Sequence, residues 1–179
     1  MNTDVSNAMT SAMTSAETAA PPAATDASGA NGAPATDAEV LVLRGRCVVP
    51  GVAEGEALVT RERISGWGGI DSRTGTIVET RHELRGVSFA GKVLVFPGAK
   101  GSSGWSNAFH LTRVLGVAPA AMLFNETTTK VALGAVVTRA PAMTDFDRDP
   151  LECIATGDWV RVDATQGIVE VRKRRRTPG

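Results

Sequence analysis

The sequence of 179 residues has few of the residue types that define several protein classes. Its two cysteines, Cys47 and Cys153, cannot make a disulfide framework, and neither has a second Cys or a His at metal-ligand spacing. No apolar run approaches the roughly 18 residues that a membrane-spanning helix needs. The formal net charge is zero, which argues against a nucleic-acid-binding protein. We therefore expect a soluble protein with no membrane span and no nucleic-acid partner.

The charges are unevenly distributed along the chain. Residues 1–37 contain four acids and no Lys or Arg, and they are mostly small or polar, so burial cannot offset the entropy of ordering them. We interpret them as a disordered low-complexity arm, because they match neither a secretory signal nor a transit peptide. At the other end, residues 172–179 form a basic tail that we expect to be solvated, although it could touch nucleic acid or an acidic partner. Residues 38–171, with 14 basic and 15 acidic side chains, remain as a near-neutral folded domain.

Apolar runs separated by turn residues predict a β-rich α/β domain with a mixed, partly parallel sheet. The predicted elements are strands over 39–49, 55–60, 92–96, 120–124 and 135–138, helices from about 104 to 115 and 126 to 133, a glycine-rich loop over 65–71, an extended piece over 76–79, and a hairpin over 159–171. Strands that alternate with helices imply right-handed crossovers and a parallel core. Residues 92–96 are almost entirely apolar, which is typical of a strand covered on both faces.

The segment Gly98–Ser103 is the candidate functional site. It lies between a buried strand and a helix, where glycines allow the backbone to close on a carboxylate or phosphate and free N–H groups attract anions. An ordinary serine cap from Ser102 or Ser103 explains the same residues. The segment has neither the order of a Walker A loop nor a Gly-x-Ser-x-Gly elbow. Of the two histidines, His110 is expected to be a surface or helix-packing residue, and the role of His82 is open.

A series of motifs occurs in a fixed order across residues 40–143. The motifs are Gly51-x-x-x-Gly55 with Ala57-Leu58-Val59, Trp67-Gly68-Gly69-Ile70-Asp71, Thr74-Gly75, Gly91 to Pro97, Gly101-Ser102-Ser103, and Ala118 to Ala121. Together they resemble the small subunit of aconitase X, which corresponds to the swivel domain of the aconitase superfamily. The resemblance implies a swivelling β/β/α fold and hydro-lyase activity. It also implies a separate large subunit whose cysteines hold an iron–sulfur cluster, with the active site in the cleft between the two chains.

The resemblance further implies roles for three residues. Ser102 corresponds to the serine that, as an alkoxide, removes the proton next to a substrate carboxylate, and Gly101 and Ser103 would bind substrate oxygens. A serine can be such a base only if N–H groups and cationic groups stabilise its anion in a closed cleft. Aconitases proper follow the two serines with an arginine that holds a carboxylate. Gly104 stands at that position, so a tricarboxylate such as citrate is not the expected substrate.

The substrates known for the family leave two alternatives. The Ala- and Arg-rich composition looks bacterial and favours cis-3-hydroxy-L-proline, which would be dehydrated to 1-pyrroline-2-carboxylate. Archaeal members instead dehydrate mevalonate 5-phosphate. A third reading is a non-catalytic swivel module that binds an anion or a protein partner at the Gly-Ser loop.

Two cysteines cannot hold a cluster, so we expect metal ligands only on the partner and none on this chain. Cys47 and Cys153 are interpreted as buried small residues of a reducing, cytoplasmic protein. Trp67 and Trp105 flank the glycine loops and could equally belong to the core or to a subunit contact.

Overall fold

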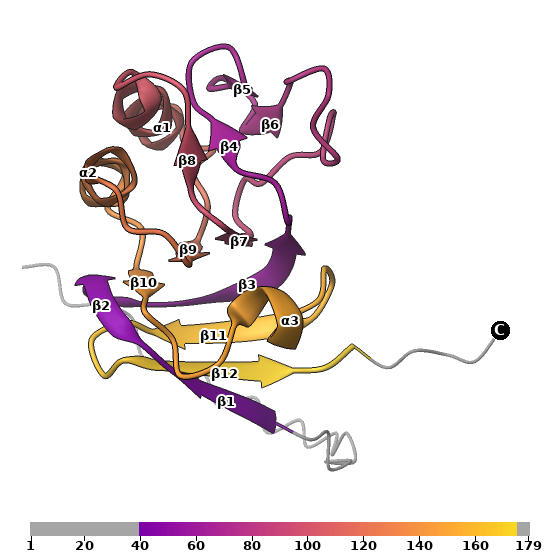
Figure 1. Cartoon of the computed structure of the whole chain (residues 1–179), viewed down its shortest axis with the longest axis vertical. Helices are drawn as coiled ribbons and strands as arrows, with labels where there is room; N and C mark the ends of the chain where they lie inside the picture. Colours follow the sequence, from indigo (N-terminus) through magenta and orange to yellow (C-terminus); the bar gives the residue numbers. More distant parts are fainter. Residues whose placement is uncertain (1–39, 175–179) are drawn as a thin grey trace, which may run out of the picture. The chain divides into compact units, whose positions relative to one another are not determined.

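Eight strands form one mixed sheet in the computed structural model, which describes residues 40–174 (Figure 1). These strands are β1 (Val40–Arg44), β2 (Arg46–Val49), β3 (Val52–Val59), β7 (Val93–Phe96), β9 (Ala121–Phe124), β10 (Ala142–Thr144), β11 (Trp159–Asp163) and β12 (Ile168–Arg172). Their order across the sheet is β1-β12-β11-β3-β7-β9-β10-β2. Strands β3, β7, β9 and β10 run parallel to one another, and the other neighbours are antiparallel. The mixed, partly parallel sheet expected from the sequence is confirmed.

The remaining elements are short strands and helices. The strands β4 (Ile64–Ser65) and β8 (Ala99–Lys100) pair in parallel, and β5 (Ile70–Asp71) pairs with β6 (Thr76–Ile77). The helices are α1 (Trp105–Val114), α2 (Thr129–Thr138) and α3 (Pro150–Cys153). The glycine-rich loop predicted over 65–71 therefore contains two short strand pieces. The sequence pattern did not indicate them because each is only two residues long.

The sheet is curled, because its first and last strands are consecutive in the chain. Strands β1 and β2 lie at opposite ends of the strand order, yet only Gly45 separates them. A Cβ at Gly45 would lie 2.7 Å from the ring of Phe146 and 2.9 Å from the carbonyl oxygen of Thr144, so only glycine fits between the two strands. The prediction of one strand over 39–49 is wrong for this reason.

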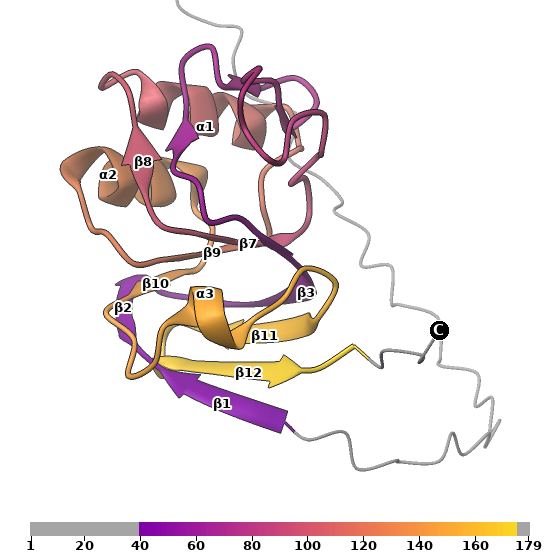
Figure 2. The ribbon, with the colours of Figure 1, turned by 45° about the vertical axis from the view of Figure 1, so that its right-hand side comes forward.

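Two apolar clusters divide the molecule into three layers. In β7, Leu94 and Phe96 pack into the cluster beneath the helices, whereas Val93 and Val95 pack into the cluster between the two halves of the curled sheet. Figures 1 and 2 show α1 and α2 on one side of β7 and β9, with β11, β12 and β1 on the other. All four residues of β7 are fully buried, which confirms that this strand is covered on both faces.

Helix α2 extends through residues that were predicted as a separate strand. Residues 135–138, expected as a strand, are the last turn of the helix, and the strand that follows it in the parallel part of the sheet is β10. Valines 136 and 137 favour a strand locally, but the helix packs closely against α1 through Gly134. A Cβ at Gly134 would lie 2.1 Å from the ring of Trp105. Packing between helices, rather than local propensity, decides the conformation of this segment.

The two predicted terminal segments are only partly described. The arm over 1–37 lies outside the described residues. Arg172, the first residue of the predicted basic tail, ends β12, and Asp158 accepts hydrogen bonds from the ammonium of Lys173 at 3.0 Å and from the N–H of Arg174 at 3.0 Å. Within 40–174, no helix is long and apolar enough to cross a membrane.

Candidate functional site

The segment Gly98–Ser103 leads from the end of β7 through β8 to the start of α1. Gly101 has φ +85°, a conformation that favours glycine and turns the chain toward the helix. Ser102 and Ser103 follow it, and all three residues are exposed. The structure thus brings the three residues singled out in the sequence to one exposed turn at the carboxyl end of β7, where ligands bind in open α/β sheets.

Contrary to the prediction, neither Ser102 nor Ser103 caps α1. The N-cap residue is Gly104, and no side chain forms a capping hydrogen bond. The hydroxyl of Ser102 instead accepts a long hydrogen bond, 3.4 Å, from the N–H of Gly104, and the carbonyl of Ser102 accepts one from the N–H of Trp105 at 3.3 Å. The capping prediction is wrong because the chain turns one residue later, which leaves both serine hydroxyls at the surface.

The base of the loop is fixed by backbone pairing and by a buried tryptophan. The carbonyl of Gly98 accepts a hydrogen bond from the N–H of Ile64 at 3.1 Å. The indole N–H of Trp105 donates to the carbonyl of Ile64 at 2.9 Å, and its ring stacks on Phe109 with centroids 4.0 Å apart. Trp105 is fully buried, so of the two alternatives weighed for it the core position is the one found.

Three cationic side chains surround the loop. Lys130 donates from its ammonium to the carbonyl oxygen of Gly101 at 2.6 Å. Lys100 lies 2.6 Å from the carboxylate of Glu79, and Arg63 forms two hydrogen bonds with the carboxylate of Glu126. The hydrogen bond with Glu126 raises the pKa of Arg63, so this guanidinium keeps its charge at every working pH. Two of the three cations are thus paired with glutamates, and among residues 40–174 Lys130 is the one of the three that has no ion-pair partner.

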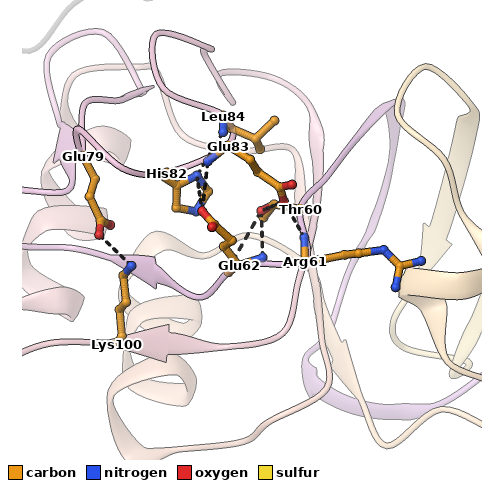
Figure 3. A network of polar contacts seen from close by, with 8 residues as sticks. All are labelled: Thr60, Arg61, Glu62, Glu79, His82, Glu83, Leu84 and Lys100. Carbon is orange, nitrogen blue, oxygen red and sulfur yellow. Dashed lines mark hydrogen bonds and ion pairs between the residues drawn. The ribbon is translucent and has the colours of Figure 1, made fainter.

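A polar network anchors the segment that carries Glu79 (Figure 3). The carboxylate of Glu83 accepts hydrogen bonds from the hydroxyl of Thr60 and, at 2.7 Å, from the N–H of Arg61. The hydrogen bond from Thr60 lowers the pKa of Glu83, which is therefore ionised at neutral pH. With the N–H of Glu83, which donates to the carboxylate of Glu62 at 2.9 Å, these bonds tie residues 60–62 to Glu83, and Figure 3 shows the Lys100–Glu79 ion pair to one side of them.

His82 is buried in this network, with 4% of its surface exposed. Its Nδ1 accepts a hydrogen bond from the N–H of Leu84 at 3.1 Å and lies 3.8 Å from the carboxylate of Glu62. His110, in contrast, is exposed on α1, which is the surface position of the two alternatives considered for it. The structure therefore places His82 in a packed turn and assigns it no chemical role.

Trp67 is the exposed aromatic residue beside the loop. It has 72% of its surface exposed and packs its Cβ side near Gly104. It also borders a pocket of about 380 Å³ that is lined by Ile70, Ala108 and Leu111 among others. An exposed tryptophan next to an apolar hollow is suited to contact with another protein.

The residues described do not fit an iron–sulfur cluster. Cys47 and Cys153 form no disulfide and are half-buried, so they are more exposed than the buried positions expected for them. Both side chains pack against the apolar side chains that fill the curled sheet. Across residues 40–174, no three His, Cys, Asp or Glu side chains gather so that they could hold a metal ion. A cluster bound to this chain alone would have too few donors.

The structure adds Lys130 and Thr128 to the residues around the loop, and the sequence analysis missed both. They lie at the start of α2, some 30 positions after Gly101 in the chain. A Thr before a run of helix-forming residues is a recognisable start signal. The contact of Lys130 with the loop follows only from the packing of α2 beside α1.

Comparison with known proteins gives consistent matches over the folded part of the chain. A family model described as "Aconitase X swivel domain" matches residues 42–171. The chain is 41% identical to the phosphomevalonate dehydratase small subunit of Methanosarcina mazei over 131 residues, which are 73% of this chain and 91% of that protein. It is 46% identical to the protein of the same name from Archaeoglobus fulgidus, over 70% of this chain and 95% of that one.

A solved structure agrees with the fold. The crystal structure of aconitase X from Thermococcus kodakaraensis, in its holo-form, matches with a TM-score of 0.70 and 39% identity. The match covers 74% of this chain and 99% of the matched chain. The swivel-type fold expected from the sequence motifs is confirmed.

Proposed function

The chain belongs to the aconitase X swivel domain family and is the small subunit of a dehydratase, and from this premise we propose that it dehydrates mevalonate 5-phosphate together with a large subunit. One observation carries the choice of substrate. Relatives that share 41% and 46% identity with this chain are named phosphomevalonate dehydratase small subunits. The ammonium of Lys130, which lies at the Gly-Ser loop and has no ion-pair partner among residues 40–174, supports an anionic substrate.

The substrate that the sequence favours, cis-3-hydroxy-L-proline, stays a second candidate. The argument for it is the Ala- and Arg-rich composition of the chain. Unlike mevalonate 5-phosphate, this substrate carries a carboxylate but no phosphate. The non-catalytic module considered from the sequence is set aside, because the relatives are subunits of dehydratases.

In the proposed reaction, Ser102 removes the proton from the carbon next to the carboxylate. Three features of the loop support this role. Ser102 is exposed, its hydroxyl oxygen accepts a hydrogen bond from the N–H of Gly104, and it lies at the N-terminal, positive end of α1. An alkoxide at Ser102 would be stabilised by this N–H and by the helix end once a partner excludes water from the cleft. The surface position fits a base that completes its site only in a complex.

Gly101 and Ser103 would bind substrate oxygens on either side of the base. Gly101 can approach a ligand closely because it has no side chain, and Ser103 offers a hydroxyl at the surface. A Cβ at Gly104 would lie 3.4 Å from the hydroxyl oxygen of Ser102 and 3.7 Å from Trp67, so a side chain at this position would stand directly beside the base.

The large subunit would supply what this chain lacks. Since the described residues do not fit a cluster, we assign the iron–sulfur cluster to a cysteine-rich large subunit, where it would act as a Lewis acid on the leaving hydroxyl. The unpaired thiols of Cys47 and Cys153 suit a reducing compartment, and we place the complex in the cytoplasm.

Trp67 would contact the large subunit. It lies next to the loop that carries Ser102, so a partner that closes the cleft over Ser102 would also cover the exposed indole. A mostly exposed tryptophan buried in this way gives an interface both apolar area and a hydrogen-bond donor.

Co-expression with a large subunit of the same family tests the proposal. The purified complex should dehydrate mevalonate 5-phosphate, measured by the absorbance of the new conjugated double bond and by mass loss of one water. Turnover of cis-3-hydroxy-L-proline instead would reverse the order of the two candidates. Stoichiometric iron on the small subunit purified alone would contradict the assignment of the cluster to the partner.

A further inference from the structure

A second cavity lies beside the Gly-Ser loop, between the start of α1 and the start of α2. Its volume is about 440 Å³. We name it the helix-start pocket, and it is lined by Ser103, Ser106, Thr128, Thr129, Lys130 and Leu133. Four of these six side chains carry hydroxyls, and the single charge among them is positive. Ser103 joins the pocket to the loop of Ser102, since the two serines are consecutive.

Both helices begin at this pocket without a side-chain cap. The N-cap residues are Gly104 for α1 and Thr128 for α2, and neither start has a capping hydrogen bond from a side chain or an acid in the first turn. The first N–H groups of a helix need an acceptor, and its dipole makes that end positive. Two such ends, each on a helix of 10 residues, face a common hollow.

Thr128 gives independent evidence that a ligand belongs there. Its hydroxyl oxygen is buried and has no hydrogen-bond partner among residues 40–174. An N-cap threonine ordinarily accepts a hydrogen bond from an N–H of the first turn, and Thr128 does not. This hydroxyl oxygen has no accessible surface, so it would have to rotate about χ1 to reach a ligand in the pocket, where it could donate to an anion and gain the partner that it lacks.

Lys130 differs from the other two cations around the loop. Lys100 and Arg63 are each paired with a glutamate, whereas Lys130 forms no ion pair within the described residues. Its ammonium uses one donor on the carbonyl of Gly101, and an ammonium has three. The charge of Lys130 therefore remains available to a ligand that enters the pocket.

We propose that the helix-start pocket binds the phosphate of the substrate while Ser102 acts on the carbon next to its carboxylate. The proposal rests on the function proposed above and assigns that substrate's second anionic group to this chain. Hydroxyls, one unpaired ammonium and two helix starts offer more donors than a carboxylate can accept, and they match the oxygens of a phosphomonoester dianion. The pocket would then distinguish a phosphorylated hydroxy acid from hydroxyproline.

Three variants of the co-purified complex test this assignment. Lys130→Met should raise the KM for mevalonate 5-phosphate about ten- to 100-fold and weaken competitive inhibition by inorganic phosphate by a similar factor. Thr128→Val should have a smaller effect in the same direction, and Thr128→Ser should restore binding. Lys92→Met is the matched control, because Lys92 pairs with Glu56 on the sheet and does not line the pocket.

The split between KM and kcat separates binding from a merely structural role. If Lys130 only held the carbonyl of Gly101 in place, Lys130→Met would lower kcat and leave phosphate inhibition unchanged, which would overturn the proposal. The function proposed above is tested separately, by turnover of the unmodified complex. If that complex does not use mevalonate 5-phosphate, calorimetric titration of the same variants with inorganic phosphate still decides the pocket: equal affinity in the unmodified and Lys130→Met complexes would refute it.

Discussion

The indole ring of Trp105 occupies the space that a side chain at Gly134 would need. A Cβ at position 134 would lie 2.1 Å from Cζ3 and 2.5 Å from Cε3 of that ring. Helices α1 and α2 are therefore in contact through one glycine and one aromatic side chain. The same contact sets the distance between the Gly-Ser loop, which precedes α1, and Lys130, which lies in the first turn of α2.

Gly134→Ala should destabilise the protein although it lies inside a helix. In an exposed helix this change would stabilise by about 1 kcal/mol, because alanine has the better helix propensity. The clash with Trp105 reverses the sign, and we expect a loss of about 1–3 kcal/mol in the free energy of unfolding. Denaturant titration measures it, with Val136→Ala as control because Val136 is 53% exposed on the same helix. A more stable Gly134→Ala variant would contradict this packing.

Ser102→Ala should abolish most of the activity of the complex. Loss of a general base lowers kcat by about 100-fold or more, and because Ser102 is exposed, the variant should be as stable as the unmodified protein. Ser88→Ala is the matched control, because this hydroxyl bonds to the carbonyls of Thr74 and Gly75 and does not belong to the loop. Steady-state kinetics decide the matter: a kcat within a few-fold of the unmodified complex would rule out Ser102 as the base.

Trp67→Ala should weaken the complex with the large subunit and leave the small subunit itself stable. Truncation of a central aromatic contact costs about 2 kcal/mol or more, so the dissociation constant should rise about 30-fold or more. Trp159→Ala is the control, since Trp159 is 45% exposed on β11 and lies outside the pocket that Trp67 lines. Sedimentation or titration of labelled subunits measures this dissociation constant. Equal dissociation constants for the two variants would mean that the interface with the large subunit does not include Trp67.

Asp158→Asn should reduce stability in a pH-dependent way. Burial opposes ionisation of Asp158, but hydrogen bonds from the N–H groups of Ala155 and Arg174 and from Lys173 outweigh it and lower its pKa. A carboxylate with a lowered pKa stabilises the fold above its unfolded pKa of about 3.9, and this contribution disappears as the pH falls through the folded pKa.

The loss in Asp158→Asn should thus be about 1.5–3 kcal/mol near neutral pH and should shrink below about pH 4. Unfolding titrations at several pH values measure it. Asp145→Asn serves as control, because its ion pair with Arg46 is more than half exposed and contributes little. A difference between unmodified protein and Asp158→Asn that stays constant with pH would mean that shape, and not charge, matters at this position.

The sequence predicted the features that depend on short-range pattern. The apolar runs of β7 and β9 and the turn of the final hairpin, where Gly167 has φ +70°, were found where the pattern placed them. The motifs around Ser102 located the candidate loop. These features are local, since burial of a strand on both faces and a positive φ at a turn each leave a direct mark on composition.

The features that the sequence did not predict depend on contacts between distant residues. The break at Gly45 follows from its closeness to Phe146, and the helical state of residues 135–138 follows from packing on Trp105. Likewise, Lys130 reaches Gly101 only because α2 lies beside α1. None of these pairs is close in sequence, so no local pattern could have indicated them.

The anchoring of the Gly-Ser loop has a consequence for how substrate would enter and leave. Gly98 and Lys100 are tied to residues 64–65, Gly101 is held by Lys130, and Trp105 is fixed in the core. A segment restrained at so many points is poorly suited to move as a flap. Opening of a cleft around Ser102 would require the small subunit to rotate as a rigid body against its partner, a motion of microseconds to milliseconds that could limit the rate of product release.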